Sequence, residues 1–299
     1  MKLHTINTGF FKLDGGAMFG VVPKSIWNKL NPADENNLCN WAMRCLLIEE
    51  GNKLILIDNG IGNKQSEKFF SHYYLHGDDS LDKSLAAKGF QKDDITDVIL
   101  THLHFDHCGG SVVRENDQLI PAFKNAVYWS NEKHWNWATN PNDREKASFL
   151  KENFVPILES RQLKMINWKS EIGNRKSEIV NKKLEKADSE ILSQLSFRFV
   201  NGHTESMMLP QINIDGKTIV YMADLLPSVA HIPIAYVMAY DMFPLTTLQE
   251  KKSFLKEAVE NNYILFFEHD PQNECCNLEQ TEKGIRQKEI FKLADVMIS

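Results

Sequence analysis

Short apolar runs separated by polar turns form the basic pattern of the chain. Two such runs lie between Cys45 and Asp58 on either side of Gly51-Asn52, which predicts a β-hairpin. Residues 81–90, with Gly89 as a stop signal near their end, predict a short helix. The run at 95–100 is short and continuously apolar, as expected for a buried strand. The first part of the chain therefore predicts strands and helices that pack in layers.

Strand-like runs return in the last third of the chain, and each leads to a polar side chain. Residues 195–200 precede His203, and two runs within 212–222 form a second predicted hairpin that leads to Asp224. The run at 263–267 leads to His269. Because ligand sites in layered α/β proteins form at strand ends and in the loops beyond them, these side chains are candidates for one shared site.

The segment at about 131–190 differs in character from the rest. It is rich in Lys, Glu, Asn and Trp, including Trp135, Trp137 and Trp168. The pattern predicts helices and loops outside the main sheets, inserted into a single domain that spans residues 1–299. Two functional roles remain open for this insertion, a lid over the site or an arm of a homodimer, beside an ordinary solvated helical layer.

Composition narrows the class of protein. The 299 residues are 42% apolar and 25% charged, which is typical of a folded globular chain. A net charge of -6 argues against a nucleic-acid or anionic-membrane partner. The five cysteines include no Cys-x-x-Cys pair, which disfavours a zinc ribbon and favours a reducing compartment. With neither a signal-peptide pattern nor an 18-residue apolar run, we expect a soluble, cytoplasmic protein.

The densest chemical signal lies directly after the run at 95–100. His102, His104, Asp106 and His107 place four potential metal ligands within six residues. Imidazole and carboxylate suit Zn²⁺, Mn²⁺, Fe²⁺ or Co²⁺, and an alternating His-x-His at a strand end puts both rings on one side. Gly109-Gly110 is expected to let the backbone bend sharply beside them. Since burying such groups unpaired costs free energy, this density predicts a metal site.

The His-x-His-x-Asp-His element resembles the most specific motif of the metallo-β-lactamase superfamily. Further pieces resemble other motifs of that family: Asn201-Gly202-His203-Thr204, Asp224, His269 and the early aspartate Asp58. The resemblance implies an α/β (α+β) fold, a four-layer αβ/βα sandwich with two metals at one edge between two mixed sheets. Ser206 stands where the family often has glycine, which weighs against a glyoxalase II or a β-lactamase proper.

The resemblance also implies the ligand sets for two divalent ions, zinc in first place, with manganese, iron or cobalt as alternatives. The first metal would take His102, His104 and His203. The second would take Asp106, His107 and His269. Asp224 would bridge the two ions, and Asp58 would support the site through contacts with its ligands.

Two metals in such a site can hold a hydroxide that attacks an ester-like bond, with Asp106 carrying the proton to the leaving group and Asp224 joining the metals. The stretches around Met18-Phe19 and His231 resemble the N-acyl homoserine lactonase and methyl parathion hydrolase group, where such loops tend to line the substrate pocket. For all three residues ordinary core packing is the alternative.

We therefore predict a small-molecule ester or lactone substrate, with an N-acyl homoserine lactone, and hence quorum quenching, in first place. An organophosphate triester or aryl ester is the alternative, because the metal ligands cannot separate these reactions. A nuclease is disfavoured by the acidic balance. A non-catalytic metal-binding member is disfavoured by the complete set of candidate ligands.

Overall fold

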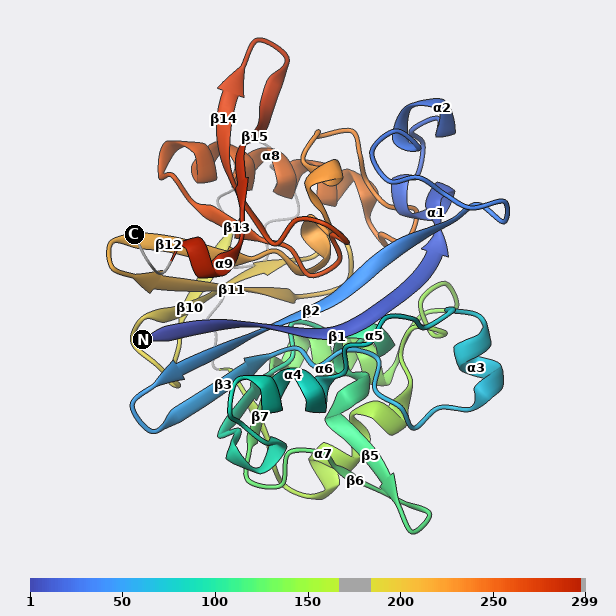
Figure 1. The fold of residues 1–299 in the computed structure, drawn as a ribbon, viewed down its shortest axis with the longest axis vertical. Helices are drawn as coiled ribbons and strands as arrows, with labels where there is room; N and C mark the ends of the chain where they lie inside the picture. Colours follow the sequence, from blue (N-terminus) through green and yellow to red (C-terminus); the bar gives the residue numbers. More distant parts are fainter. Residues whose placement is uncertain (167–183, 297–299) are drawn as a thin grey trace.

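Two large β-sheets organise residues 1–166 and 184–296, which are the residues described by this computed structural model (Figure 1). In this described part the first sheet has the order β1-β2-β3-β4-β7-β8. Its strands are β1 (Lys2–Asp14), β2 (Leu38–Glu50), β3 (Lys53–Ile57), β4 (Asp97–Ile99), β7 (Val127–Ser130) and β8 (Leu163–Met165). The second sheet has the order β15-β14-β13-β12-β11-β10-β9. Its strands are β9 (Glu185–Asp188), β10 (Leu195–Val200), β11 (Met207–Ile214), β12 (Lys217–Tyr221), β13 (Ile264–Phe266), β14 (Cys275–Thr281) and β15 (Gly284–Phe291).

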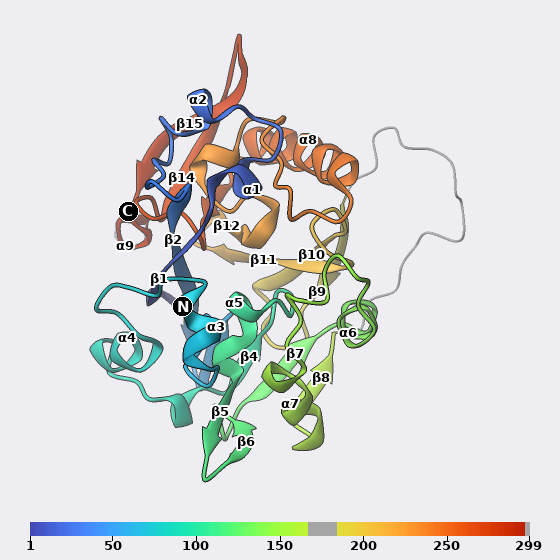
Figure 2. The same ribbon diagram turned by 90° about the vertical axis from the view of Figure 1, so that its right-hand side faces the viewer.

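Helices cover the outer side of both sheets, which gives four layers (Figure 2). The six-stranded sheet is covered by α4 (Leu81–Ala87), α6 (Glu132–Thr139) and α7 (Val155–Glu159), and the seven-stranded sheet by α8 (Pro244–Glu260). The remaining helices are α1 (Gly15–Phe19), α2 (Lys24–Trp27), α3 (Glu67–Ser71), α5 (Phe105–Cys108) and α9 (Leu293–Val296), and β5 (Val112–Glu115) pairs with β6 (Gln118–Pro121). The predicted four-layer αβ/βα sandwich is confirmed.

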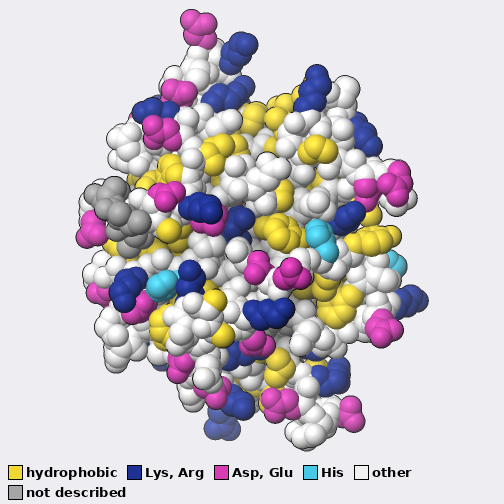
Figure 3. All heavy atoms as spheres, in the orientation of Figure 1, with side chains coloured by type: hydrophobic (Ala, Val, Ile, Leu, Met, Phe, Trp, Pro, Cys, Tyr) yellow, Lys and Arg dark blue, Asp and Glu magenta, His cyan; other side chains and the backbone are white. Residues whose placement is uncertain are grey.

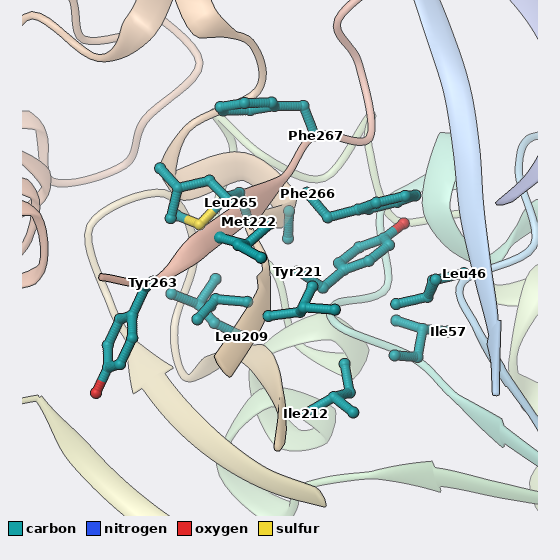
Figure 4. Packing of buried hydrophobic residues seen from close by; sticks show 14 of the residues in the cluster. Leu46, Ile57, Leu209, Ile212, Tyr221, Met222, Tyr263, Leu265, Phe266 and Phe267 are labelled. Carbon is teal, nitrogen blue, oxygen red and sulfur yellow. The ribbon is translucent and has the colours of Figure 1, made fainter. Parts of the chain in front are cut away.

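Both faces of the central strands are buried, which explains their continuous apolar runs. Along β2, Leu46 and Ile48 face the second sheet, whereas Cys45 and Leu47 face the helical layer. Tyr221 of β12 approaches Leu46 from the opposite sheet (Figure 4). Because successive side chains of a strand point to opposite faces, each strand between a sheet and a helical layer must be apolar on both sides.

Most of the predicted elements are present. The hairpin predicted at 45–58 is β2 and β3, and the hairpin at 212–222 is β11 and β12. The strands predicted at 95–100, 195–200 and 263–267 are β4, β10 and β13, and the helix at 81–90 is α4. Parallel pairing of β3 with β4 and of β12 with β13 aligns the ends of these strands at one edge of the sandwich.

The prediction of helices and loops throughout 131–190 is wrong at two short segments, which are β-strands. Helices α6 and α7 are present, but β8 and β9 add an edge strand to each sheet. Residues 167–183, which include Trp168, lie outside the described residues. Both strands are only three or four residues long and are partly exposed. They carry charged side chains and lack the apolar pattern of a buried strand, which is why the sequence did not predict them.

Acidic and basic side chains are interspersed over the face shown in Figure 3. None of the helices in the described ranges combines the length and apolarity needed to cross a bilayer. All five cysteines are buried free thiols.

An ion pair between Arg198 and Glu257 connects α8 to the second sheet. The guanidinium of Arg198, on β10, is fully buried and donates to both carboxylate oxygens of Glu257 at 2.8 and 2.9 Å. Lys186 adds a contact of 2.9 Å. Hydrogen bonds from Arg198 are the main cause that lowers the pKa of Glu257 to about 2. Such bidentate pairs fix geometry as well as contributing free energy.

We expect Glu257→Gln to lower the free energy of unfolding at pH 7 by about 1.5–3 kcal/mol, the range for a hydrogen bond to a charged group. Since the folded-state pKa lies below the usual value, this stabilisation is present above about pH 4.5 and is lost as pH falls toward 2. Urea unfolding with chelator at pH 7 and pH 3 measures the difference, with the exposed Glu260→Gln as control. An equal loss at both pH values would contradict this explanation.

Candidate metal centre

Four loops that follow parallel or adjacent strands meet at one edge of the sandwich. They follow β4, β10, β12 and β13, and they bring together all seven side chains predicted to bind metal: His102, His104, Asp106, His107, His203, Asp224 and His269. Each of the seven is buried, with Asp106 the most exposed at 8%. Residues that are far apart in sequence meet here because β3 pairs in parallel with β4 and β12 with β13. The ends of these strands therefore lie at the same edge of the sandwich.

The candidate ligand atoms form two groups in the described part of the chain, and the members of each lie within 4.8 Å of one another. The first group is His102, His104, His203 and Asp224, and the second is Asp106, His107 and His269. Asp224 links them, since its Oδ2 lies 3.1 Å from His203 Nε2 and its Oδ1 lies 3.2 Å from His269 Nε2. The same Oδ2 is 3.6 Å from His107 Nε2.

The nitrogen and oxygen atoms that face the middle of the two ligand groups are better suited to contact with cations than to contact with one another. His102 Nε2 is buried without a hydrogen-bond partner among the described residues. The Nε2 atoms of His107 and His269 face each other at 3.1 Å. Unsatisfied buried polar atoms cost free energy, and imidazole nitrogens with carboxylate oxygens are a donor set for divalent transition metals. The residues therefore fit a pair of such ions.

Hydrogen bonds behind the imidazoles determine which ring nitrogen faces the centre. His203 Nδ1 contacts Asp241 Oδ1 at 2.9 Å, and His269 Nδ1 contacts the Ala42 carbonyl at 2.8 Å. His104 is turned the other way, with Nε2 3.0 Å from a Glu145 carboxylate oxygen. Acceptors of this kind fix the tautomer and ring orientation of histidines that bind metal.

Two carboxylates lie behind His107. Its Nδ1 is 3.2 Å from Asp58 Oδ2 and 3.0 Å from Glu268 Oε2, and all three side chains are fully buried. Asp58 also accepts hydrogen bonds from the Thr101 backbone amide at 2.8 Å and from the Thr101 hydroxyl at 2.6 Å. Asp58 thus joins the end of β3 to the loop after β4. This is the contact that a supporting role for Asp58 requires.

Without a metal ion, the candidate ligands differ in the direction in which their pKa values are shifted. Burial, together with His107 and His104, holds the pKa of His102 well below its usual value, so this imidazole is neutral. Burial acts to raise the pKa of Asp224, but His203 and His107 outweigh it and hold the pKa well below the usual range. Burial likewise acts to lower the pKa of His203, yet Asp224 and Asp241 raise it to about 10.

Glycines near the centre serve close packing. Gly109 has an ordinary helical φ of -61°, so it is not needed there for a left-handed backbone conformation. A Cβ on Gly109 would lie 2.1 Å from the Ile61 carbonyl oxygen, and one on Gly110 would lie 2.3 Å from that of Asn59. Gly202 plays the same part beside His203, because α8 begins directly against it. These positions lack a side chain because another backbone passes there.

The residues proposed to contact substrate belong to a buried aromatic cluster. Met18 and Phe19 are 2% and 0% exposed, and the Phe19 ring stacks on His231 with centroids 4.7 Å apart. His231 is also buried, and its Nε2 contacts the Met18 carbonyl at 2.9 Å. Phe11, in the same cluster, reaches His269 at 5.6 Å between rings. Direct contact of Met18, Phe19 or His231 with substrate stays a prediction.

Three carboxylates around the centre were not predicted. Asp241 and Glu145 contact histidines 38 and 41 residues away, and no local pattern marks either of them. Glu268 stands next to His269 after an apolar run, which is a usable signal, but its contact is with His107.

Comparisons with known proteins identify the family. The model of the metallo-beta-lactamase superfamily matches residues 44–269. An N-acyl homoserine lactonase from Bacillus thuringiensis is 30% identical over 129 residues, which are 40% of this chain and 47% of the relative. The chain therefore spans about half the length of the curated relatives it matches.

Solved structures extend the likeness over the whole fold. A probable metal-dependent hydrolase from Staphylococcus aureus superposes with a TM-score of 0.82 at 27% identity, covering 97% of this chain and 96% of that one. AidC, a dizinc quorum-quenching lactonase, superposes with a TM-score of 0.74 at 22% identity, covering 98% and 97%. Since the family match covers more than half of the chain, this protein belongs to the metallo-β-lactamase superfamily of metal-dependent hydrolases.

Proposed function

We propose that this protein hydrolyses an ester-like bond in a small molecule with two divalent metal ions, zinc in first place, and that its substrate is a lactone of the N-acyl homoserine type. The observation that carries the proposal is Asp224, whose two oxygens face histidines of both ligand groups. The first ion would be held by His102, His104 and His203. The second would be held by Asp106, His107 and His269, with Asp224 shared.

The chemistry needs few groups beyond these ligands. Two bound divalent ions supply a water molecule of lowered pKa and a Lewis-acid contact for the carbonyl oxygen. Asp106 is buried within the site, and we propose that its carboxylate takes up a proton and returns it to the leaving oxygen. Asp224 holds the two halves of the centre at a constant separation. The buried histidines are fixed from behind and need no rearrangement during turnover.

Apolar side chains beside Asp106 favour a substrate with an acyl or aryl part. Phe105 packs against Tyr73 and Phe69, with ring centroids 4.7 and 5.4 Å away. A surface formed by these aromatic rings would bind a hydrocarbon group and would not discriminate between an acyl chain and an aryl ring. We put the lactone first because of the similarity to an N-acyl homoserine lactonase over part of the chain.

Turnover of three substrate classes by one metal-loaded preparation tests the proposal. We expect N-acyl homoserine lactones to give the highest kcat/KM, ahead of p-nitrophenyl acetate and a paraoxon-like phosphotriester. The same preparation after chelator treatment serves as the control and should lose turnover of all three. Lactone turnover at the background rate, with rapid cleavage of the phosphotriester or the aryl ester, would overturn the lactone assignment in favour of those alternatives.

A further inference from the structure

The outward nitrogen of His104 contacts a carboxylate that comes from the insertion. His104 Nδ1 faces the centre, 3.1 Å from His203 Nε2, while its Nε2 lies 3.0 Å from Glu145 Oε1. Glu145 is only 1% exposed and follows α6 in the segment between β7 and β8. A buried carboxylate is costly unless it is paired, so its placement here needs a reason.

The insertion itself holds this carboxylate in place. The indole Nε1 of Trp137 donates to Glu145 Oε2 at 2.6 Å, which leaves Oε1 directed at His104. The backbone amide of Glu145 donates to the Asn142 side chain at 3.1 Å. Both partners lie within eight residues of Glu145, so the local fold of the insertion orients the carboxylate.

The insertion also binds the residues on either side of His104. The backbone amide of Leu103 donates to His134 Nε2 at 2.8 Å, and that of Phe105 donates to the Ser148 carbonyl at 3.0 Å. Three consecutive residues of the motif are thus hydrogen-bonded to the insertion. A purely solvated helical layer would not need such contacts.

We propose that the described part of the insertion, residues 131–166, is a clamp on the metal-binding motif, and that Glu145 is a positioning residue that holds His104 with Nδ1 directed at the first metal. This inference rests on the ligand assignment of the proposed function. A carboxylate behind a metal-bound imidazole fixes the ring and strengthens its basicity, and loss of such a partner typically costs 10- to 100-fold in metal affinity. The effect is confined to the first ligand group, because the second contains no contact with Glu145 among its described hydrogen bonds.

Metal titration of the full-length protein tests this directly. Zn²⁺ is titrated against a competing chelator, and Co²⁺ is titrated while its visible absorption is followed, for wild type, Glu145→Ala and Glu145→Gln. We expect Glu145→Ala to weaken one of two binding steps by about 10- to 100-fold and to leave the other unchanged. Glu145→Gln keeps an acceptor oxygen without charge and should weaken the same step less. Glu159→Gln, an exposed carboxylate on α7 of the same insertion, should bind both ions as wild type does.

Two results would overturn the clamp. One is unchanged affinity in both Glu145 variants. The other is equal weakening of both steps, which a merely structural role would produce. Wild-type protein that binds no more than one ion would instead contradict the dinuclear site of the proposed function, so the two failures are distinguishable.

Discussion

Replacing Asp224 by alanine is expected to lower kcat/KM by more than about 100-fold, beyond the usual cost of losing a partner behind a metal ligand. The reason is its position between the two ligand groups. Its Oδ2 lies 3.1 Å from His203 Nε2, and its Oδ1 lies 3.2 Å from His269 Nε2. Alanine would leave histidines of both groups facing an empty centre, with no carboxylate to share between two cations. Initial rates on the best substrate of the three classes, with metal content measured in parallel, check this.

His104→Ala should also lower kcat/KM strongly, because it removes one of the three imidazoles of the first ligand group. Asp224→Asn keeps the shape of the side chain without its charge and separates loss of volume from loss of charge. The exposed Asp117→Asn, at a turn where asparagine tolerates the positive φ of +65°, is the matched control and should behave as wild type. Circular dichroism establishes that each variant is folded. Full activity in Asp224→Ala or His104→Ala would refute the assignment of the centre.

The core of this centre was predictable because its residues are marked locally. His102 to His107 form a dense cluster in sequence, and His203, Asp224 and His269 each follow an apolar run that proved to be a strand. The pattern of apolar residues and the residues typical of turns identify such strands. The parallel pairing of β12 with β13 then brings the ends of these two strands together. The same logic placed Asp58 at the end of β3, where it contacts Thr101 and His107.

The surroundings of the centre were not predictable because they depend on packing between distant segments. Glu145 is a single carboxylate in a polar stretch and Asp241 is one in a mostly apolar stretch, and only the folded chain shows that each contacts an imidazole. The edge strands β8 and β9 are too short and too polar to differ from loops in sequence. Phe19 and His231 were predicted only from a resemblance to line the substrate pocket, and their mutual stacking is a property of the packed cluster. Residues that support a site through others carry weaker sequence signals than residues that bind directly.

Removal of metal is expected to destabilise the whole protein as well as to inactivate it. The folded chain holds seven candidate ligands together, and one of their inner atoms, His102 Nε2, has no hydrogen-bond partner within the described ranges. An ion that binds the folded state but not the unfolded state contributes about 4 kcal/mol when its free concentration is about 1,000 times Kd. For a chain of this length the melting temperature should fall by roughly 5–10 °C on chelation.

Thermal unfolding of metal-loaded, chelator-treated and metal-restored protein measures this shift, with elemental analysis of each sample. Re-addition of Zn²⁺ or Mn²⁺ should restore the midpoint, because the outer contacts of Asp58, Asp241 and Ala42 keep the imidazoles oriented in the metal-free chain. Asp224→Ala is the sharper control: its midpoint should respond less to metal than that of wild type, since both ions lose a shared ligand. Unchanged midpoints in wild-type samples that elemental analysis shows to differ in metal content would mean that metal binding is not coupled to the stability of this fold.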